Sequence, residues 1–518
     1  MSTPWRGGFV ADRLAVTIHS DPTSAIAVED LVGLALRRNP KRAHLLVSTV
    51  LAKHVPTEPA LVMAAGGLLG AFVAHELLTD DADSGHPQSG PPAAALAQAA
   101  AALGTALQGL PGQRQGAISH LGEEVAGLET RVPDAVVIGY AETATGLGRL
   151  VANALGAYYI HSTRHATPGI DSVAGFEEGH SHATSHAMVP TDPHWLDGGG
   201  PVVLVDDEFS TGSTVINTIR ELHALSPHDL YVVAALIDLR SAADRARFDA
   251  LAAELGAKIV VTALGTGWIE LGADILDRAA ELIRELPAAT PELAAADQAA
   301  PQPRTNGTVP GSGRLSMLEL SGADIAPVRS DRFGNAEPPP EGDISVIAGQ
   351  LATHLANLGC QGPLVILGCE ENMFLPLAVA HALTRLLPGR DVRFSTTTRS
   401  PIVPVDRADY AIAGALTFAS HDLTNDGPGV RFAYNLNGRG QQPGTIVVFP
   451  EPGTNRSAVT RGHAGSKNAD SKYPFPLDAT GTALPSLADA LTAAAGDVVV
   501  VLLPVDTPQP TRQPEDAP

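Results

Sequence analysis

The sequence has very little cysteine and few basic residues, and both shortages limit the kind of protein it can be. Only two of the 518 residues are cysteines, Cys360 and Cys369, and neither belongs to a spacing typical of a metal site. A disulfide is conceivable, but two buried thiols in a reducing compartment are the expectation. The net charge of −22 argues against a nucleic-acid partner or an anionic membrane surface.

Long apolar runs are also missing. No stretch of 18 or more uninterrupted apolar residues occurs, and the first residues, Met1 to Arg6, lack the apolar core of a signal peptide. We therefore expect a cytoplasmic protein with no membrane partner. The chain is 44% hydrophobic and long enough for two or three domains.

Changes in composition divide the chain. Residues 79–92 are a polar loop, and residues 287–312, rich in Ala, Pro and Gly, predict a flexible interdomain linker. The predicted domains are therefore 1–286 and 313–504, followed by a disordered tail over 505–518.

The segment from Val202 to Thr214 is the most informative part of the sequence. Four apolar residues predict a buried strand over 202–205, Asp206 and Asp207 follow it, and a Ser/Thr/Gly loop then opens a helix. Backbone N–H groups at a helix start attract phosphate, and glycine allows a close backbone approach. The two carboxylates suit vicinal sugar hydroxyls instead. A 5-phosphoribosyl group has both ends, with the phosphate at Ser210, Thr211, Gly212, Ser213 and Thr214.

Strands and helices alternate on both sides of this motif. Apolar runs predict further strands over 136–138, 158–160, 230–237 and 259–263, with helices between them. The alternation favours an α/β fold with a mainly parallel sheet flanked by helices, in which ligands bind at the carboxyl ends of the strands.

The acidic pair and the run Thr211-Gly212-Ser213-Thr214 resemble the phosphoribosyl-diphosphate (PRPP) motif of type I phosphoribosyltransferases. The resemblance implies PRPP as a substrate and Mg²⁺ as a cofactor, carried mainly by the substrate and bound by few protein groups, with Asp206 and Asp207 as its protein ligands. It also implies that both carboxylates favour the positive charge that develops on ribose during catalysis.

Two further segments match loops of these enzymes. The residues after the strand at 136–138 correspond to the loop that holds pyrophosphate, with a helix-initiating turn as the alternative. A glutamate there is awkward unless it acts through Mg²⁺ or points away. Arg164 could stabilise the leaving group, and histidines of a mobile hood could close over it. A transition-metal site and a solvated polar loop are alternatives for the histidines. These candidates are Tyr140, Ala141, Glu142 and Thr143 in the loop, and His180 and His182 in the hood.

A narrower resemblance rests on Asn39-Pro40-Lys41-Arg42, Val47-Ser48, Lys53-His54 and residues 176–184. These segments resemble the orotate-phosphoribosyltransferase-like family from tellurite-resistance-associated gene clusters. Members carry a C-terminal domain named for a Thr-Arg-Ser-Pro (TRSP) motif, which is present here at 398–401. The resemblance implies an enzyme of nucleotide metabolism that makes a nucleoside-like stress metabolite, and it makes a homodimer a reasonable expectation.

The second half repeats landmarks of the first half in order. Residues 136–142 are echoed by 364–370, and the strand at 202–205 is echoed by 445–449. Pro450-Glu451-Pro452 replaces the acidic pair, and proline removes a donor N–H. We therefore predict a second, degenerate phosphoribosyltransferase-like α/β domain that does not bind PRPP in the usual way. It either has its own ligand site or packs structurally against the first domain, the candidate residues being Thr398, Arg399, Ser400, His421 and Asp422.

The predicted function is that of a phosphoribosyltransferase, a pentosyltransferase that moves 5-phosphoribose from Mg·PRPP to a base-like small molecule and releases pyrophosphate. Two alternatives stay open. The chain is otherwise a catalytically silent regulator that senses PRPP or a nucleotide, or an enzyme that cleaves the glycosidic bond of a nucleotide.

Overall fold

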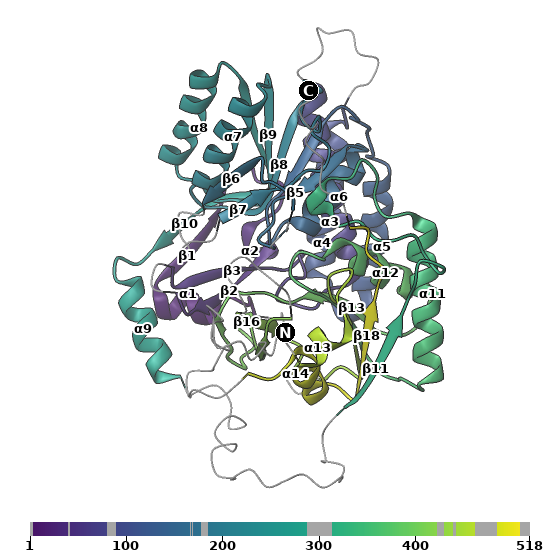
Figure 1. The fold of residues 1–518 in the computed structure, drawn as a ribbon. Helices are drawn as coiled ribbons and strands as arrows, with labels where there is room; N and C mark the ends of the chain where they lie inside the picture. Colours follow the sequence, from purple (N-terminus) through teal and green to yellow (C-terminus); the bar gives the residue numbers. More distant parts are fainter. Residues whose placement is uncertain are drawn as a thin grey trace, which may run out of the picture.

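The computed structural model describes residues 4–39, 42–79, 90–165, 167, 169–177, 185–286, 313–421, 429–438, 442–461 and 484–507 (Figure 1). The predicted linker, residues 80–89 of the predicted polar loop and the tail from residue 508 lie outside these ranges. So do His180, His182 and Asp422.

The first half folds around a six-stranded sheet with the order β1-β10-β9-β8-β4-β5. All neighbouring strands are parallel except β1, which runs antiparallel to β10. The central strands are almost wholly buried, which explains their continuous apolar runs. The strands are β1 (Val16–Ser20), β4 (Val136–Gly139), β5 (Tyr158–His161), β8 (Val202–Phe209), β9 (Leu230–Asp238) and β10 (Lys258–Leu271).

Helices cover both faces of this sheet. Helices α7 (Ser213–Leu225) and α8 (Ala242–Leu255) pack on one face, in a cluster with Ile138 and Leu204. Helices α3 (Pro59–Thr79) and α6 (Thr145–Leu155) pack on the other, with α4 (Ala93–Gln108) and α5 (Pro111–Ala126) outside them (Figure 1). The predicted α/β class is therefore confirmed.

Helix α3 is long and apolar enough to cross a membrane by length and composition alone. However, 67% of its apolar window is buried inside the molecule, and it contacts α6, α5, α4 and the strands β9 and β10. These contacts make it the central helix of the core, and they account for apolar residues on all of its sides.

The second half contains a five-stranded, fully parallel sheet with the order β11-β18-β17-β12-β13. Helices α11 (Glu341–Asn357) and α12 (Phe374–Leu386) pack on one face and α14 (Leu487–Ala494) on the other. The strands are β11 (Arg314–Glu319), β12 (Leu364–Gly368), β13 (Val392–Thr396), β17 (Thr445–Phe449) and β18 (Asp497–Leu502).

The two sheets share their central topology. The order β5-β4-β8-β9 in the first matches β13-β12-β17-β18 in the second, with every pair parallel. Each half also has a two-stranded antiparallel hairpin, β6 (Ala174–Glu177) with β7 (Ser185–Met188) and β15 (Ala415–Ala419) with β16 (Val430–Tyr434). The duplication predicted from the sequence is therefore present in the fold.

Hydrogen bonds give the alignment of the two halves residue by residue. Ser162 N donates to Gly139 O at 3.0 Å, and Thr397 N donates to Gly368 O at the same distance. Gly139 thus corresponds to Gly368, and Glu142 to Glu371. The sequence comparison, which set residues 136–142 against 364–370, was wrong by one position. Both segments are runs of apolar residues, and such runs match almost equally well when one is shifted by one residue.

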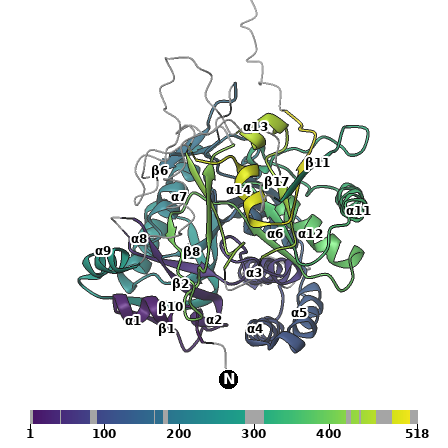
Figure 2. The ribbon, with the colours of Figure 1, turned by 90° about the horizontal axis from the view of Figure 1, so that it is seen from below.

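The halves also interlock. Strand β14 (Ile402–Val403) of the second half adds to β2 (Val32–Arg37), which pairs with β3 (His44–Ser48). Helices α3, α6 and α12 lie together between the two large sheets (Figure 2). Cys360 and Cys369 are buried free thiols, as expected.

Candidate active site

The acidic pair lies within a longer strand than the sequence suggested. Strand β8 continues to Phe209 and keeps its pairing with β9, with Asp206 opposite Ala235 and Glu208 opposite Ile237. Asp207 N donates to Asp206 Oδ1 at 2.9 Å. Burial, with the neighbouring Glu208 charge, raises the pKa of Asp207 to about 6, although Lys53 acts in the opposite direction.

Two basic residues from the N-terminal region face this acidic strand. Lys53 is 8% exposed, and its Nζ donates to Thr143 Oγ1 at 2.7 Å. It therefore connects the acidic strand with the loop after β4. Arg42 forms an ion pair with Glu208. The sequence assigned no role to either residue, and the only signal was that both belong to segments that carry the family resemblance.

The phosphate loop has the geometry that its sequence predicted. Gly212 has φ +69°, and a Cβ there would lie 2.5 Å from Phe248 Cε2. Only glycine combines this backbone conformation with that space. The N-cap residue Gly212 has no side chain to cap α7, and at the helix start Ser213 N donates to Thr211 Oγ1 at 3.4 Å.

Two arginines support this loop. The Arg240 guanidinium lies 4.4 Å from the Phe248 ring centroid and donates to Asp238 Oδ2 at 2.8 Å. These contacts hold the Phe248 ring in place beside Gly212. Arg247 Nη1 donates to Ser213 Oγ at 3.2 Å and brings a positive charge beside it. Arg247 lies on α8, more than 30 residues from Ser213, and the local motif contains no signal for it.

The loop after β4 is held from two directions. Tyr140 N donates to Val205 O at 3.1 Å, and Ala141 N donates to Ser162 Oγ at 3.0 Å. Tyr140 itself is buried in the core, which raises the pKa of its phenol. Two of the N–H groups predicted to hold pyrophosphate are therefore used inside the protein, and the loop contributes Thr143 and Glu142 to the site.

Glu142 is 5% exposed and meets two arginines. Its Oε1 lies 2.6 Å from Arg399 Nε and 3.9 Å from Arg164 Nη1. A carboxylate in a pyrophosphate loop was an awkward feature of the sequence. The guanidinium groups compensate its charge, and the nearer one comes from the second half of the chain.

Arg164 connects the hood hairpin to this site. Its Nη2 lies 3.0 Å from His186 Nε2, and His186 Nδ1 lies 3.0 Å from Ser162 Oγ. Because arginine only donates, His186 accepts at Nε2 and carries its proton on Nδ1, which donates to Ser162. His186 was not among the predicted hood residues and lies at the site, whereas His180 and His182 fall outside the described residues.

Asp206 and Asp207 also form the donor set that suits Mg²⁺. Both are partly buried carboxylates, and burial together with the Glu208 charge raises the pKa of Asp207, an effect that a bound cation would offset. Oxygen donors of this kind fit a magnesium ion that arrives with a phosphorylated substrate.

Comparison with known families agrees with this geometry. A model described as phosphoribosyl transferase matches residues 31–268, and a model described as the TRSP domain C-terminal to that family matches residues 329–462. Together they span more than two thirds of the chain. The chain therefore has a phosphoribosyl transferase domain followed by the TRSP domain that is C-terminal to that family. The phosphoribosyltransferase class and the TRSP domain predicted from the sequence are thereby confirmed.

Solved structures that are similar to part of the chain include two adenine phosphoribosyltransferases. One is from Trypanosoma brucei, in complex with AMP, pyrophosphate and ribose-5-phosphate, with 17% identity, 29% of this chain and 68% of that chain covered, and a TM-score of 0.22. The other is from Saccharomyces cerevisiae, with 19% identity, 30% and 81% covered, and a TM-score of 0.18. A search of curated proteins found no match.

Among the described candidate residues of the TRSP domain, Arg399 lies against the other domain. Arg399 contacts Glu142 of the phosphoribosyl transferase domain and, through Nε, Glu370 Oε2 at 3.1 Å. Arg431 also pairs with Glu370. Burial alone would raise the pKa of Glu370, but Arg431 and Arg399 hold that pKa well below its usual range. Thr398 Oγ1 accepts from Ser400 N at 3.2 Å, and His421 is buried.

At the place in the TRSP domain that corresponds to the acidic pair, a glutamate is already paired with an arginine of the same domain. Phe449 lies opposite Gly368 as Val205 lies opposite Gly139, so Glu451 corresponds to Asp207. Glu451 forms an ion pair with Arg332. Its carboxylate, that of Glu371 and the His165 ring offer ligand atoms within 4.8 Å of one another, a spacing that could hold a metal ion. However, Glu371 already accepts from Thr163 Oγ1 and Arg164 N, at 2.7 and 2.8 Å.

Proposed function

We propose that this chain is a PRPP-dependent phosphoribosyltransferase, which transfers 5-phosphoribose to a nitrogen of a base-like acceptor and releases pyrophosphate. One observation carries the proposal. The acidic pair with its phosphate loop and the loop after β4 leave the carboxyl ends of two hydrogen-bonded neighbours, β8 and β4. PRPP has a phosphate, a diol and a diphosphate. The phosphate loop suits the phosphate, Asp206 and Asp207 suit the diol, and Lys53, which bonds to Thr143 of the loop after β4, suits the diphosphate.

The described side chains divide the substrate between them. The N–H groups at the start of α7, together with Arg247, suit the 5′-phosphate. Asp206 and Asp207 suit the ribose hydroxyls. Lys53, which bonds to Thr143 of the loop after β4, supplies positive charge for the pyrophosphate.

The chemistry follows from these positions. The bond between ribose C1 and the pyrophosphate oxygen breaks, and its electron pair leaves with pyrophosphate. The acceptor nitrogen forms the new bond to C1 from the opposite face. Asp206 and Asp207 favour the positive charge that ribose carries in between, while Lys53 and Arg164 favour the charge on the leaving group. Mg²⁺, held by Asp206 and Asp207 together with the substrate, would add positive charge beside the pyrophosphate.

A silent PRPP sensor is the second candidate, and the loop after β4 favours it. Two of its N–H groups are bonded within the protein, and it carries a buried carboxylate, Glu142. A sensor would bind PRPP and saturate without turnover. Pyrophosphate release in the presence of a panel of purine and pyrimidine bases separates the two candidates, and a product that keeps a base–ribose bond excludes glycosidic cleavage. The family resemblance supports a nucleoside-like stress metabolite as the eventual product.

Calorimetric titration with Mg·PRPP tests the shared step. We expect the wild type to bind and the Asp206→Asn/Asp207→Asn variant to bind at least 10-fold more weakly, because each lost charged hydrogen bond contributes about 1.5–3 kcal/mol. An Asp274→Asn/Asp277→Asn variant removes the same charge from the exposed surface of α9 (Ile275–Glu285) and its N-terminal flank and should bind normally. Wild type that does not bind, or a double variant at the acidic pair that binds equally well, would overturn the proposal.

A further inference from the structure

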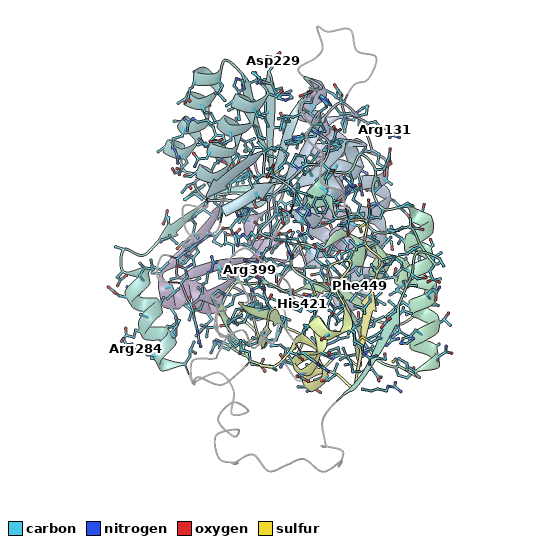
Figure 3. All side chains as sticks on the ribbon, viewed as in Figure 1. Arg131, Asp229, Arg284, Arg399, His421 and Phe449 are labelled. Carbon is cyan, nitrogen blue, oxygen red and sulfur yellow. The ribbon has the colours of Figure 1, made fainter. Side chains whose placement is uncertain are left out.

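The arginine of the Thr-Arg-Ser-Pro motif lies at the active site of the other domain. Arg399 follows β13 in the TRSP domain and lies in the middle of the molecule, between the two sheets (Figure 3). Its Nε is 2.6 Å from Oε1 of Glu142, which belongs to the loop after β4. The side chains are only 14% and 4% exposed, so little water lies around this ion pair.

The contact is one half of a reciprocal arrangement. Arg399 corresponds to Arg164, and Glu142 corresponds to Glu371, by the alignment given above. In the opposite direction, Thr163 Oγ1 and Arg164 N donate to Glu371 of the TRSP domain. The segment after β5 therefore reaches the loop after β12, and the segment after β13 reaches the loop after β4. Two subunits of a symmetrical dimer would exchange contacts in the same way.

The two directions of this exchange differ in chemistry. The TRSP domain receives a hydroxyl and a backbone N–H, whereas the phosphoribosyl transferase domain receives a full positive charge. A buried carboxylate without such a partner is costly and would repel pyrophosphate. Arg164 is farther from Glu142, at 3.9 Å, and it also contacts His186. Arg399 is therefore the nearer counter-charge of Glu142, and its Nε also donates to Glu370 Oε2 at 3.1 Å.

We propose that Arg399 is a positioning residue of the phosphoribosyl transferase site. It neutralises Glu142 and holds the loop of residues 140–143 in the form that accepts the pyrophosphate of PRPP. The TRSP domain thus completes the active site in place of a second subunit. The ligand in this inference rests on the proposed function, but the effect of Arg399 on the loop does not.

Four variants separate this role from general packing. Arg399→Met removes the charge, Arg399→Lys keeps it, and Glu142→Gln removes the carboxylate that needs it. Arg431→Met is the control, because Arg431 is 3% exposed and pairs with Glu370, which Arg399 also contacts, but in the described structure it does not pair with Glu142. We expect Arg399→Met to weaken Mg·PRPP binding at least 10-fold, Arg399→Lys to recover part of it, and Arg431→Met to stay within about 3-fold of wild type. Glu142→Gln added to Arg399→Met should restore binding in part.

Hydrogen exchange of peptides that cover residues 139–146 gives a readout that needs no ligand. Exchange in these peptides should be faster in Arg399→Met than in wild type and unchanged in Arg431→Met. If wild type fails to bind PRPP, the proposed function fails, while the exchange data still decide whether Arg399 positions the loop. Unchanged exchange in Arg399→Met, or equal effects in Arg399→Met and Arg431→Met, would overturn the inference.

Discussion

Two carboxylates of the candidate site are stabilised in different ways. Glu142 is compensated by arginines, the nearer of which is Arg399. Asp207 is buried and has the Glu208 charge beside it, and both effects raise its pKa above the ordinary value. In a site that binds sugar hydroxyls through carboxylates, the negative charges are compensated by the ligand and its cation only when these are bound. The site should therefore lower the stability of the free protein.

Replacement of Asp207 by asparagine should stabilise the unliganded protein at neutral pH. The pKa of Asp207 is about 6 in the folded protein against an ordinary 3.8, so the native state holds the proton more tightly between these values. Stability therefore falls as pH rises from about 4 to 6. We expect Asp207→Asn to gain about 1–3 kcal/mol at pH 7.5 and little at pH 4, measured by urea denaturation.

Asp277→Asn on the exposed surface of α9 is the control for this comparison. A gain of the same size in Asp277→Asn, or a gain that does not depend on pH, would contradict the assignment of the shift to Asp207. The same titration with Mg·PRPP should give weaker binding by Asp207→Asn, so stability and affinity move in opposite directions.

The site residues that could be predicted from the sequence are those that lie in one continuous segment. Strand β8, Gly212 and the start of α7 form their site through local backbone geometry, which a run of residue types specifies. Lys53, Arg247 and Arg399 reach the site from distant positions in the chain. Their side chains carry no signal of what they meet, because long-range pairing depends on how the elements pack.

At the scale of elements, the hood hairpin and the loop after β4 share the hydroxyl of Ser162 as a hydrogen-bond partner. Ser162 Oγ accepts from Ala141 N and contacts His186 Nδ1 of β7, so it joins β5, the loop and the hairpin. The sequence predicted each element but not this junction. Ser162 is wholly buried, and the sequence does not show whether a buried serine only packs or also forms hydrogen bonds.

Ser162→Ala should therefore loosen the loop. Ala141 N–H and His186 would lose their shared partner, and an unsatisfied buried donor costs about 1–3 kcal/mol. We expect a loss of stability in that range and weaker Mg·PRPP binding, measured by urea denaturation and calorimetry. Ser172→Ala is the matched control, because the Ser172 hydroxyl bonds to Ala174 O at the exposed base of the same hairpin. Equal effects of the two substitutions would exclude Ser162 as the junction.

At the scale of the whole molecule, the duplicated halves are not independent domains joined by a linker, because they share strand pairing and an apolar core. The sequence showed that the second half repeats the first, since strand order and loop positions follow from local apolar runs. It did not show that the halves interlock, because strand β14 has only two residues and pairs with β2 across more than 360 positions of sequence. The apolar core of the first half also includes Tyr410, Ile412 and Tyr434.

This interlocking predicts that the phosphoribosyl transferase domain cannot fold alone. A fragment of residues 1–286 would lose β14 and would expose Val62 and Leu150, which are buried against Met373 and Leu377. Exposed apolar area of this kind leads to aggregation. We expect the fragment to be insoluble when it is expressed alone and soluble when it is co-expressed with residues 313–518, with the two chains eluting together in size-exclusion chromatography. A soluble, monomeric 1–286 fragment that binds Mg·PRPP as tightly as the full chain would show that the TRSP domain is dispensable for both the fold and the site.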